Sequence, residues 1–264
     1  MSNTTFDMNG DHRPDRVSLS LREAVPAWIA LLAVTALAWV VTLDQVRAMG
    51  NGAGTMGMSL VAFVAMWTAM MAAMMFPSMA PVAILWTRSI LRRRSSAVAF
   101  YRIVLFASGY LLAWAAAGVM AYFGLALFEQ VLVFAASDAG LLGAGIFVTA
   151  GVYQLTPFKD VCLKHCRSPM SLLTHYTSFS GPAVDLRVGI HHGLYCIACC
   201  WGLMLILVAV GVMNIPAMVA LTVVIFAEKI LPQGLLIARI TGICFFGAAI
   251  AALIWPSAFP GLLR

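Results

Sequence analysis

The sequence predicts an all-α fold: a polytopic transmembrane helix bundle with about seven spans. Of the 264 residues, 62% are hydrophobic and only 10% are charged, whereas soluble domains carry about 25% charged residues. The apolar residues form runs long enough to cross a bilayer as helices. The basic residues collect in alternate loops between these runs, which is typical of cytoplasmic loops and does not indicate nucleic-acid binding.

The order of the runs predicts one membrane domain. Residues 1–23 are polar and mixed in charge, so we expect a disordered cytoplasmic tail. Residues 24–264 then form a single transmembrane domain, with its N-terminus and its basic loops in the cytoplasm. Residues 124–139 contain acidic but no basic residues and are expected to form an outer loop, in which an interfacial helix is an alternative to irregular structure. The expected spans are 24–43, 58–86, 98–123, 139–156, 191–213, 217–232 and 236–255.

The stretch HHGLYCIACCWGLM, residues 191–204, is the centre of the functional prediction. On a helix, His192, Cys196 and Cys199 fall within an arc of about 60°, and Cys200 lies about 40° further round. Nitrogen and sulfur donors on one face suit a soft metal ion. His192 and Cys199 are about 10.5 Å apart along the axis. We therefore expect either two neighbouring sites, to which His191 also belongs, or one site completed by another helix.

Two further segments offer soft ligands. In the second expected span, methionines recur every fourth residue and form two adjacent stripes that include Met70, Met71, Met74 and Met75. Such stripes are often core packing, but thioether and thiolate together select Cu(I). In the cytoplasmic Cys/His loop, 157–187, a short helix would present Cys162 and Cys166 to one ion, with His165 beside them.

Charged residues near these segments are candidates to support the ligands or to carry protons. Glu228 lies just inside the expected end of the sixth span, where a carboxylate is normally paired or functional. Lys229 is expected to extend its ammonium toward the membrane interface, and Asp160 accompanies the loop cysteines. Cys244 is expected to pack, and His175 to be interfacial or solvated. Because most of the six cysteines lie near the cytoplasmic face, we expect reduced thiols and no disulfide framework.

Four motifs in combination resemble a family of bacterial integral membrane proteins predicted to bind metals. They are MMAAMMFP from Met70, KDVCLKHCR from Lys159, HGLYCIACCWGLM from His192, and the pair Glu228–Lys229. The family includes a membrane copper chaperone that serves a bacterial tyrosinase. The resemblance implies metal binding, with copper favoured, in the bacterial inner membrane.

The function predicted from the sequence is Cu(I) binding and its delivery to a partner copper enzyme or across the membrane. Zinc or another transition metal is an alternative cargo, and a soluble metal donor is an alternative partner. Two other classes stay open. One is a membrane metalloenzyme in which Glu228 or His191 moves protons. The other is a thiol redox protein that uses Cys162 with Cys166, or Cys196 with Cys199 or Cys200.

Overall fold

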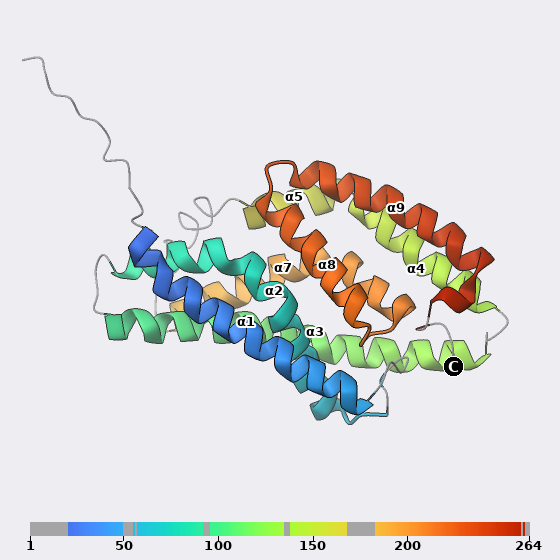
Figure 1. The fold of residues 1–264 in the computed structure, drawn as a ribbon, viewed down its shortest axis with the longest axis horizontal. Coiled ribbons are helices and arrows are strands. Elements are labelled where there is room, and N and C mark those ends of the chain that lie inside the picture. The colour runs from blue at the N-terminus through green and yellow to red at the C-terminus, as the bar shows by residue number, and fades with distance from the viewer. Residues whose placement is uncertain are drawn as a thin grey trace, which may run out of the picture.

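In the computed structural model, every regular element of the described residues is helical (Figure 1). The structure describes residues 21–49, 55, 57–91, 96–134, 138–167, 183–259 and 261. Residues 1–20, residues 135–137 of the expected outer loop, and residues 168–182 of the Cys/His loop, with His175, lie outside this set, so the predictions made for them are untested. The helices are α1 (Leu21–Met49), α2 (Leu60–Leu91), α3 (Ser96–Phe134), α4 (Ala139–Gln154), α5 (Pro157–Arg167), α7 (Val184–Val210), α8 (Ile215–Ile230) and α9 (Gly234–Ile254), followed by a 3-10 turn η2 (Pro256–Ala258).

The all-helical class is confirmed, while the number of spans is not. Four described segments are long and apolar enough to cross a membrane: 60–79, 100–133, 184–210 and 234–254. A fifth span results if α4 and α5, which meet at 62°, form one broken span. Helix α8 has 16 residues, which at 1.5 Å per residue gives about 24 Å, less than the hydrocarbon core. The seven spans and the cytoplasmic N-terminus therefore stay predictions.

The expected end of the third span at residue 123 is wrong, because helix α3 continues to Phe134, whereas the outer position of this segment stays a prediction. The sequence of this part is rich in Leu, Val and Phe and lacks proline. Leu125 and Leu132 are buried, and the carboxylate of Glu129 accepts hydrogen bonds from the backbone N–H and the hydroxyl of Thr55. Apolar packing and a satisfied carboxylate thus extend the helix beyond the length of a simple span.

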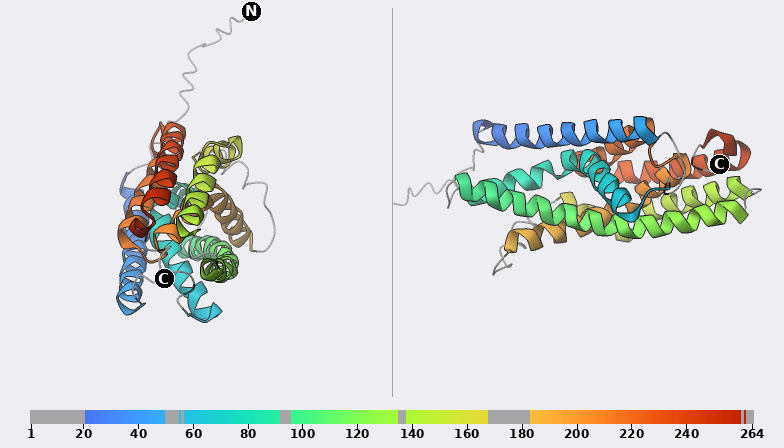
Figure 2. Two further views of the ribbon diagram at one scale, coloured as in Figure 1. Left: turned by 90° about the vertical axis from the view of Figure 1, so that its right-hand side faces the viewer. Right: turned by 90° about the horizontal axis from the view of Figure 1, so that it is seen from below.

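Helix α7 is the hub of the bundle: it packs most extensively against α3 and also contacts α4, α5 and α8. The long helices run broadly along one axis of the molecule (Figure 2). Gly109 on α3 and Gly189 on α7 lie where the backbones of these two helices come close together. A side chain at Gly189 would collide with the carbonyl of Phe106, and one at Gly109 with the carbonyl of Leu186. Small residues at a helix crossing let the two backbones come together.

Helix α2 passes on the other side of α3 and also contacts α1 and α8. Its course changes direction within the helix (Figures 1 and 2), and its sequence contains Pro77 and Pro81. A proline inside a helix removes one backbone hydrogen bond and is a common cause of such a bend.

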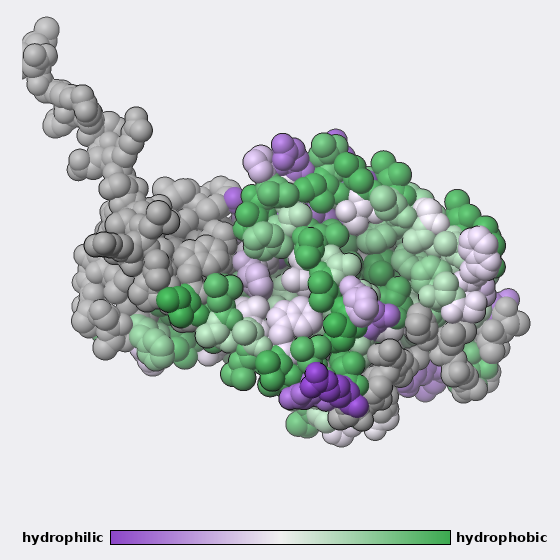
Figure 3. Space-filling view, viewed as in Figure 1, coloured by the Kyte–Doolittle hydropathy of each residue, from purple (hydrophilic) through white to green (hydrophobic). Residues whose placement is uncertain are grey.

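Much of the surface is apolar. Hydrophobic residues cover the face over α8 and α9 (Figure 3), and on α9 Ile240, Ile243 and Ile250 are each more than half exposed. Cys244 is exposed as well, so the expectation that it packs inside the bundle is wrong. A large apolar surface of this kind marks a region that contacts lipid or another protein.

Candidate metal-handling site

The thiols of α7 lie in the interior, on the face predicted from the sequence. Cys196, Cys199 and Cys200 are each no more than 2% exposed, and His192 is 4% exposed. The Cys199 and Cys200 thiols both donate to the carbonyl of Cys196, at 3.2 and 2.9 Å. All three thiols thus lie within one helical turn and point into the protein rather than toward its surface.

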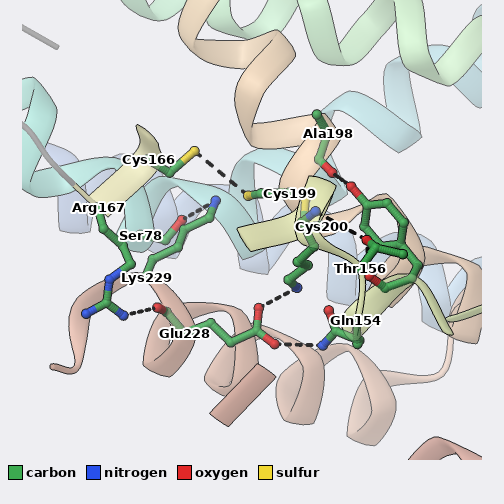
Figure 4. A network of polar contacts seen from close by, with 12 residues as sticks. Ser78, Gln154, Thr156, Cys166, Arg167, Ala198, Cys199, Cys200, Glu228 and Lys229 are labelled. Atoms are coloured by element: carbon green, nitrogen blue, oxygen red, sulfur yellow. Dashed lines mark hydrogen bonds and ion pairs between the residues drawn. The ribbon is translucent and has the colours of Figure 1, made fainter. Parts of the chain in front are cut away.

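Helix α5 completes the group with a thiol from the predicted Cys/His loop. The Sγ of Cys166 lies 3.9 Å from the Sγ of Cys199 (Figure 4), well beyond the S–S bond length of about 2.05 Å. Cys162 on the same helix is buried. The structure thus brings thiols from two helices, α5 and α7, together, and whether they share one ion stays a prediction.

The break between α4 and α5 positions Cys166. The chain turns by 62° after Gln154 and restarts with Pro157 as the first residue of α5, a position where proline is well tolerated because its missing N–H needs no partner. At the far end, the guanidinium of Arg167 donates to the carbonyls of Glu228, at 2.6 Å, and Pro232, at 3.0 Å. Helix α5 is thereby fixed against the end of α8.

Lys229 is buried beside the thiols, so the expectation that it extends to the interface is wrong. Its Nζ lies 2.9 Å from the Sγ of Cys196 and 3.4 Å from the Oγ of Ser78 on α2. The hydroxyl of Tyr110 is also 3.1 Å from the Cys196 sulfur. The side chain turns inward because a polar environment of sulfur and hydroxyl groups is available to it there.

Glu228 forms a separate buried ion pair, as expected for a carboxylate at this depth. Its carboxylate receives a hydrogen bond from Lys159 Nζ at 2.7 Å and another from Gln154 Nε2 at 2.7 Å (Figure 4). Lys159, which belongs to the expected cytoplasmic Cys/His loop, is fully buried. Asp160 instead lies 3.6 Å from Arg239, a residue that is well exposed to solvent, and the structure does not bring it to the thiols.

The predicted histidines all pack against aromatic rings. His192 packs against the rings of Phe106 and Tyr110, with centroid distances of 6.1 and 6.0 Å, and its buried Nδ1 has no hydrogen-bond partner. His165 stacks on Tyr195 at 3.8 Å, and His191 lies 5.0 Å from the same ring. The rings of His165 and His191 are themselves 6.0 Å apart, so these two histidines and Tyr195 form one aromatic group.

The methionines predicted as ligands are buried in the same core. Met70, Met71, Met74 and Met75 are at most 1% exposed and belong to the apolar cluster that contains the cysteines. The polar contact of α2 with the site is made by Ser78, and Phe76 contacts Tyr110. Across the described residues, no group of three or more His, Cys, Asp or Glu side chains is arranged to hold an ion.

Tyr110, Ser78, Gln154 and Lys159 were missed as site residues. One signal was available for Lys159, since a carboxylate such as Glu228 inside a membrane needs a buried cation. The others carry no sequence signal of their own, because tyrosine, serine and glutamine are common in helices of every kind.

A family model described as a copper chaperone, PpoB2, matches residues 64–252. This match covers more than half of the chain. The chain belongs to the PpoB2 family of copper chaperones. No curated protein and no solved structure matches it. The region matched by the PpoB2 family contains the thiols of α5 and α7, the methionines of α2 and the Glu228–Lys229 pair, and it agrees with the resemblance drawn from these motifs.

Proposed function

We propose that this PpoB2-family protein is embedded in the bacterial inner membrane, binds Cu(I) between Cys166 and Cys199 and delivers it to a copper-dependent enzyme. The observation that carries the proposal is the sulfur–sulfur distance of 3.9 Å. With metal–sulfur bonds of about 2.3 Å, two thiolates that share one ion lie about 3.8 Å apart at a tetrahedral angle and about 4.6 Å apart in a line. The pair needs little movement to hold an ion.

The chemistry of the donors favours Cu(I) among the candidate metals. Thiolate and thioether ligands are soft and select Cu(I), whereas structural Zn(II) sites use four ligands. The pair offers two thiols, and the described residues hold no preformed group of three. Zinc is therefore the less suitable cargo.

Delivery is supported by the position of the pair between an accessible helix and the interior. Cys166 is partly exposed on α5, while Cys199 is buried on α7 next to Cys196 and Cys200. A copper ion that enters at Cys166 can pass to deeper sulfur atoms by exchange of one ligand at a time. In this proposal Cys196, Cys200 and the α2 methionines form the inner part of the path, while His165, His191 and His192 support it. The apolar helices and the exposed isoleucines of α9 support the membrane location.

A Cu(I) competition titration tests the proposal. Full-length protein in detergent, under reducing conditions, competes with a chromophoric Cu(I) chelator. Cys166→Ser and Cys199→Ser should each weaken binding by at least about tenfold, which corresponds to about 1.4 kcal/mol. Cys244→Ser is the matched control, because Cys244 is exposed on α9, and it should leave the affinity unchanged. Equal affinities in all three variants would remove the pair from the site.

A thiol redox function is the second candidate, and the same geometry favours it. In this second proposal Cys166 and Cys199, 3.9 Å apart, form the disulfide, whereas the sequence suggested Cys162 with Cys166, or Cys196 with Cys199 or Cys200. Counting free thiols before and after mild oxidation distinguishes the two functions. The thiol redox function is favoured by two results together. Oxidation removes two free thiols in the wild-type protein but not in Cys199→Ser, and the reduced wild-type protein does not bind Cu(I).

A further inference from the structure

The end of α5 that carries Cys166 is held by the next residue in the chain, Arg167. The two terminal nitrogens of its guanidinium donate to different carbonyls, those of Glu228 at 2.6 Å (Figure 4) and Pro232 at 3.0 Å. Both acceptors lie in one short region, the last turn of α8 and the turn that leads into α9. Two charge-assisted hydrogen bonds from one planar group fix a direction as well as a distance.

Gly234, the first residue of α9, leaves room for this guanidinium. A Cβ atom at this position would overlap with Nη1 of Arg167 and with the carbonyl of Glu228. The described glycines with positive φ are Gly57 and Gly211, so the backbone conformation does not require glycine at position 234. The close contact with the guanidinium and the carbonyl requires it.

Glu228 contacts α5 at a second point. Its carboxylate pairs with Lys159 at 2.7 Å, while its carbonyl accepts the hydrogen bond from Arg167. Lys159 and Arg167 are about 12 Å apart along the axis of α5, at 1.5 Å per residue. Two separated contacts with the end of α8 fix the tilt of α5 as well as its position. This tilt sets how close Cys166 comes to Cys199.

We propose that Arg167 and Gly234 are positioning residues for the thiol pair, which set the separation of the Cys166 and Cys199 sulfur atoms and thereby the affinity for Cu(I). This inference rests on the proposed Cu(I) site. Neither residue is a proposed ligand, and Gly234 lies on α9, which carries no proposed ligand. Two sulfurs that share one ion through bonds of about 2.3 Å lie about 3.8 to 4.6 Å apart. The present distance is 3.9 Å, so a shift of the α5 end by more than about 1 Å leaves the ion with one sulfur.

The test applies two independent measurements to the full-length protein in detergent. The first is the Cu(I) affinity in the chelator competition. The second is the rate at which diamide oxidises Cys166 and Cys199 to a disulfide, measured as loss of free thiols relative to Cys199→Ser. In this reaction diamide takes up the two thiol hydrogens, and no copper is needed. The oxidation rate therefore reports the approach of the two sulfurs independently of metal binding.

Arg167→Gln should weaken Cu(I) binding and slow disulfide formation by about tenfold or more, the scale expected for the loss of charge-assisted hydrogen bonds. Arg167→Lys should stay impaired in both, because a single ammonium nitrogen does not reproduce the planar fork. Arg239→Gln is the matched control. Arg239 is an exposed arginine of α9 that lies 3.6 Å from Asp160 of α5, and its replacement makes the same change in net charge and should alter neither measurement.

Gly234→Ala should change both measurements in the same direction as Arg167→Gln, because the added methyl group displaces the guanidinium. If it acts through Arg167, the double variant should be no more than about twofold weaker than Arg167→Gln alone. Fully additive effects would overturn the link between Gly234 and Arg167.

Wild-type values of both measurements in Arg167→Gln would overturn the inference. So would full recovery by Arg167→Lys, which would assign the effect to charge, or a loss of affinity without slower oxidation. Failure of the proposed function looks different: the wild-type protein would bind no Cu(I), while oxidation would still be slower in Arg167→Gln. A thermal melt of each variant verifies folding, and the Arg167 variants test the inference if Gly234→Ala does not fold.

Discussion

The buried ion pair between Lys159 and Glu228 gives the sharpest stability prediction. The two side chains are 0% and 2% exposed, and the N–O distance is 2.7 Å. Among the described residues, the other donor to the carboxylate is the neutral amide of Gln154. Lys159→Met keeps the bulk of the side chain but leaves the carboxylate charge uncompensated. Removing one partner of such a pair typically costs about 3 to 5 kcal/mol.

Equilibrium unfolding in mixed detergent micelles measures this loss. Lys159→Met should lower the free energy of unfolding by about 3 kcal/mol or more, and the double variant Lys159→Met with Glu228→Gln should recover most of it because no isolated charge remains. Arg239→Met is the control, since Arg239 pairs with Asp160 at the surface and should change stability by less than about 1 kcal/mol. If Lys159→Met and Arg239→Met behave alike, the buried pair does not hold α5 against α8.

Three other outcomes follow from the packing and the charge pattern. Gly189→Ala should destabilise the bundle by about 1 to 3 kcal/mol in a thermal melt, because the added methyl group meets the backbone of Phe106; an unchanged melting temperature would refute this close approach. Met74→Leu combined with Met75→Leu should weaken Cu(I) binding in the chelator titration with little loss of stability, and unchanged affinity would leave these buried residues as ordinary core. A reporter fused after Arg94 should be cytoplasmic and one near Ala136 external, so the reverse result would overturn the predicted topology.

Sequence periodicity was sufficient for the parts of the site that lie on one helix. The face formed by Cys196, Cys199 and Cys200 follows from a period of 3.6 residues, and the structure confirms that all three are buried. The short helix that carries Cys162 and Cys166 was also expected. Local spacing determines both features, so they need no knowledge of the tertiary structure.

The contacts between helices could not be derived in this way. The approach of Cys166 to Cys199 depends on the break between α4 and α5. It also depends on the hydrogen bond from Arg167 to the carbonyl of Glu228 at the end of α8. The direction of Lys229 depends on which groups α2 and α7 place around it. Helix ends at lipid normally let lysine reach water, and only the tertiary arrangement shows that this one turns to sulfur.

The continuation of α3 was missed for a related reason. Acidic residues without basic ones indicate an outer loop by charge, but charge distribution reports the side of the membrane and not the local conformation. The contact of Glu129 with Thr55 joins two segments far apart in the sequence. A carboxylate satisfied in this way lets an apolar helix extend beyond its expected end.

Copper X-ray absorption of the reduced, Cu(I)-loaded protein tests the central claim most directly. The account predicts a low-coordinate site with two sulfur ligands in the wild-type protein, and replacement of one sulfur by a lighter ligand, or loss of bound copper, in Cys166→Ser and in Cys199→Ser. The Cys244→Ser protein should give the wild-type spectrum. A wild-type spectrum dominated by nitrogen ligands, or one that neither Cys166→Ser nor Cys199→Ser changes, would contradict a Cu(I) site between these two cysteines.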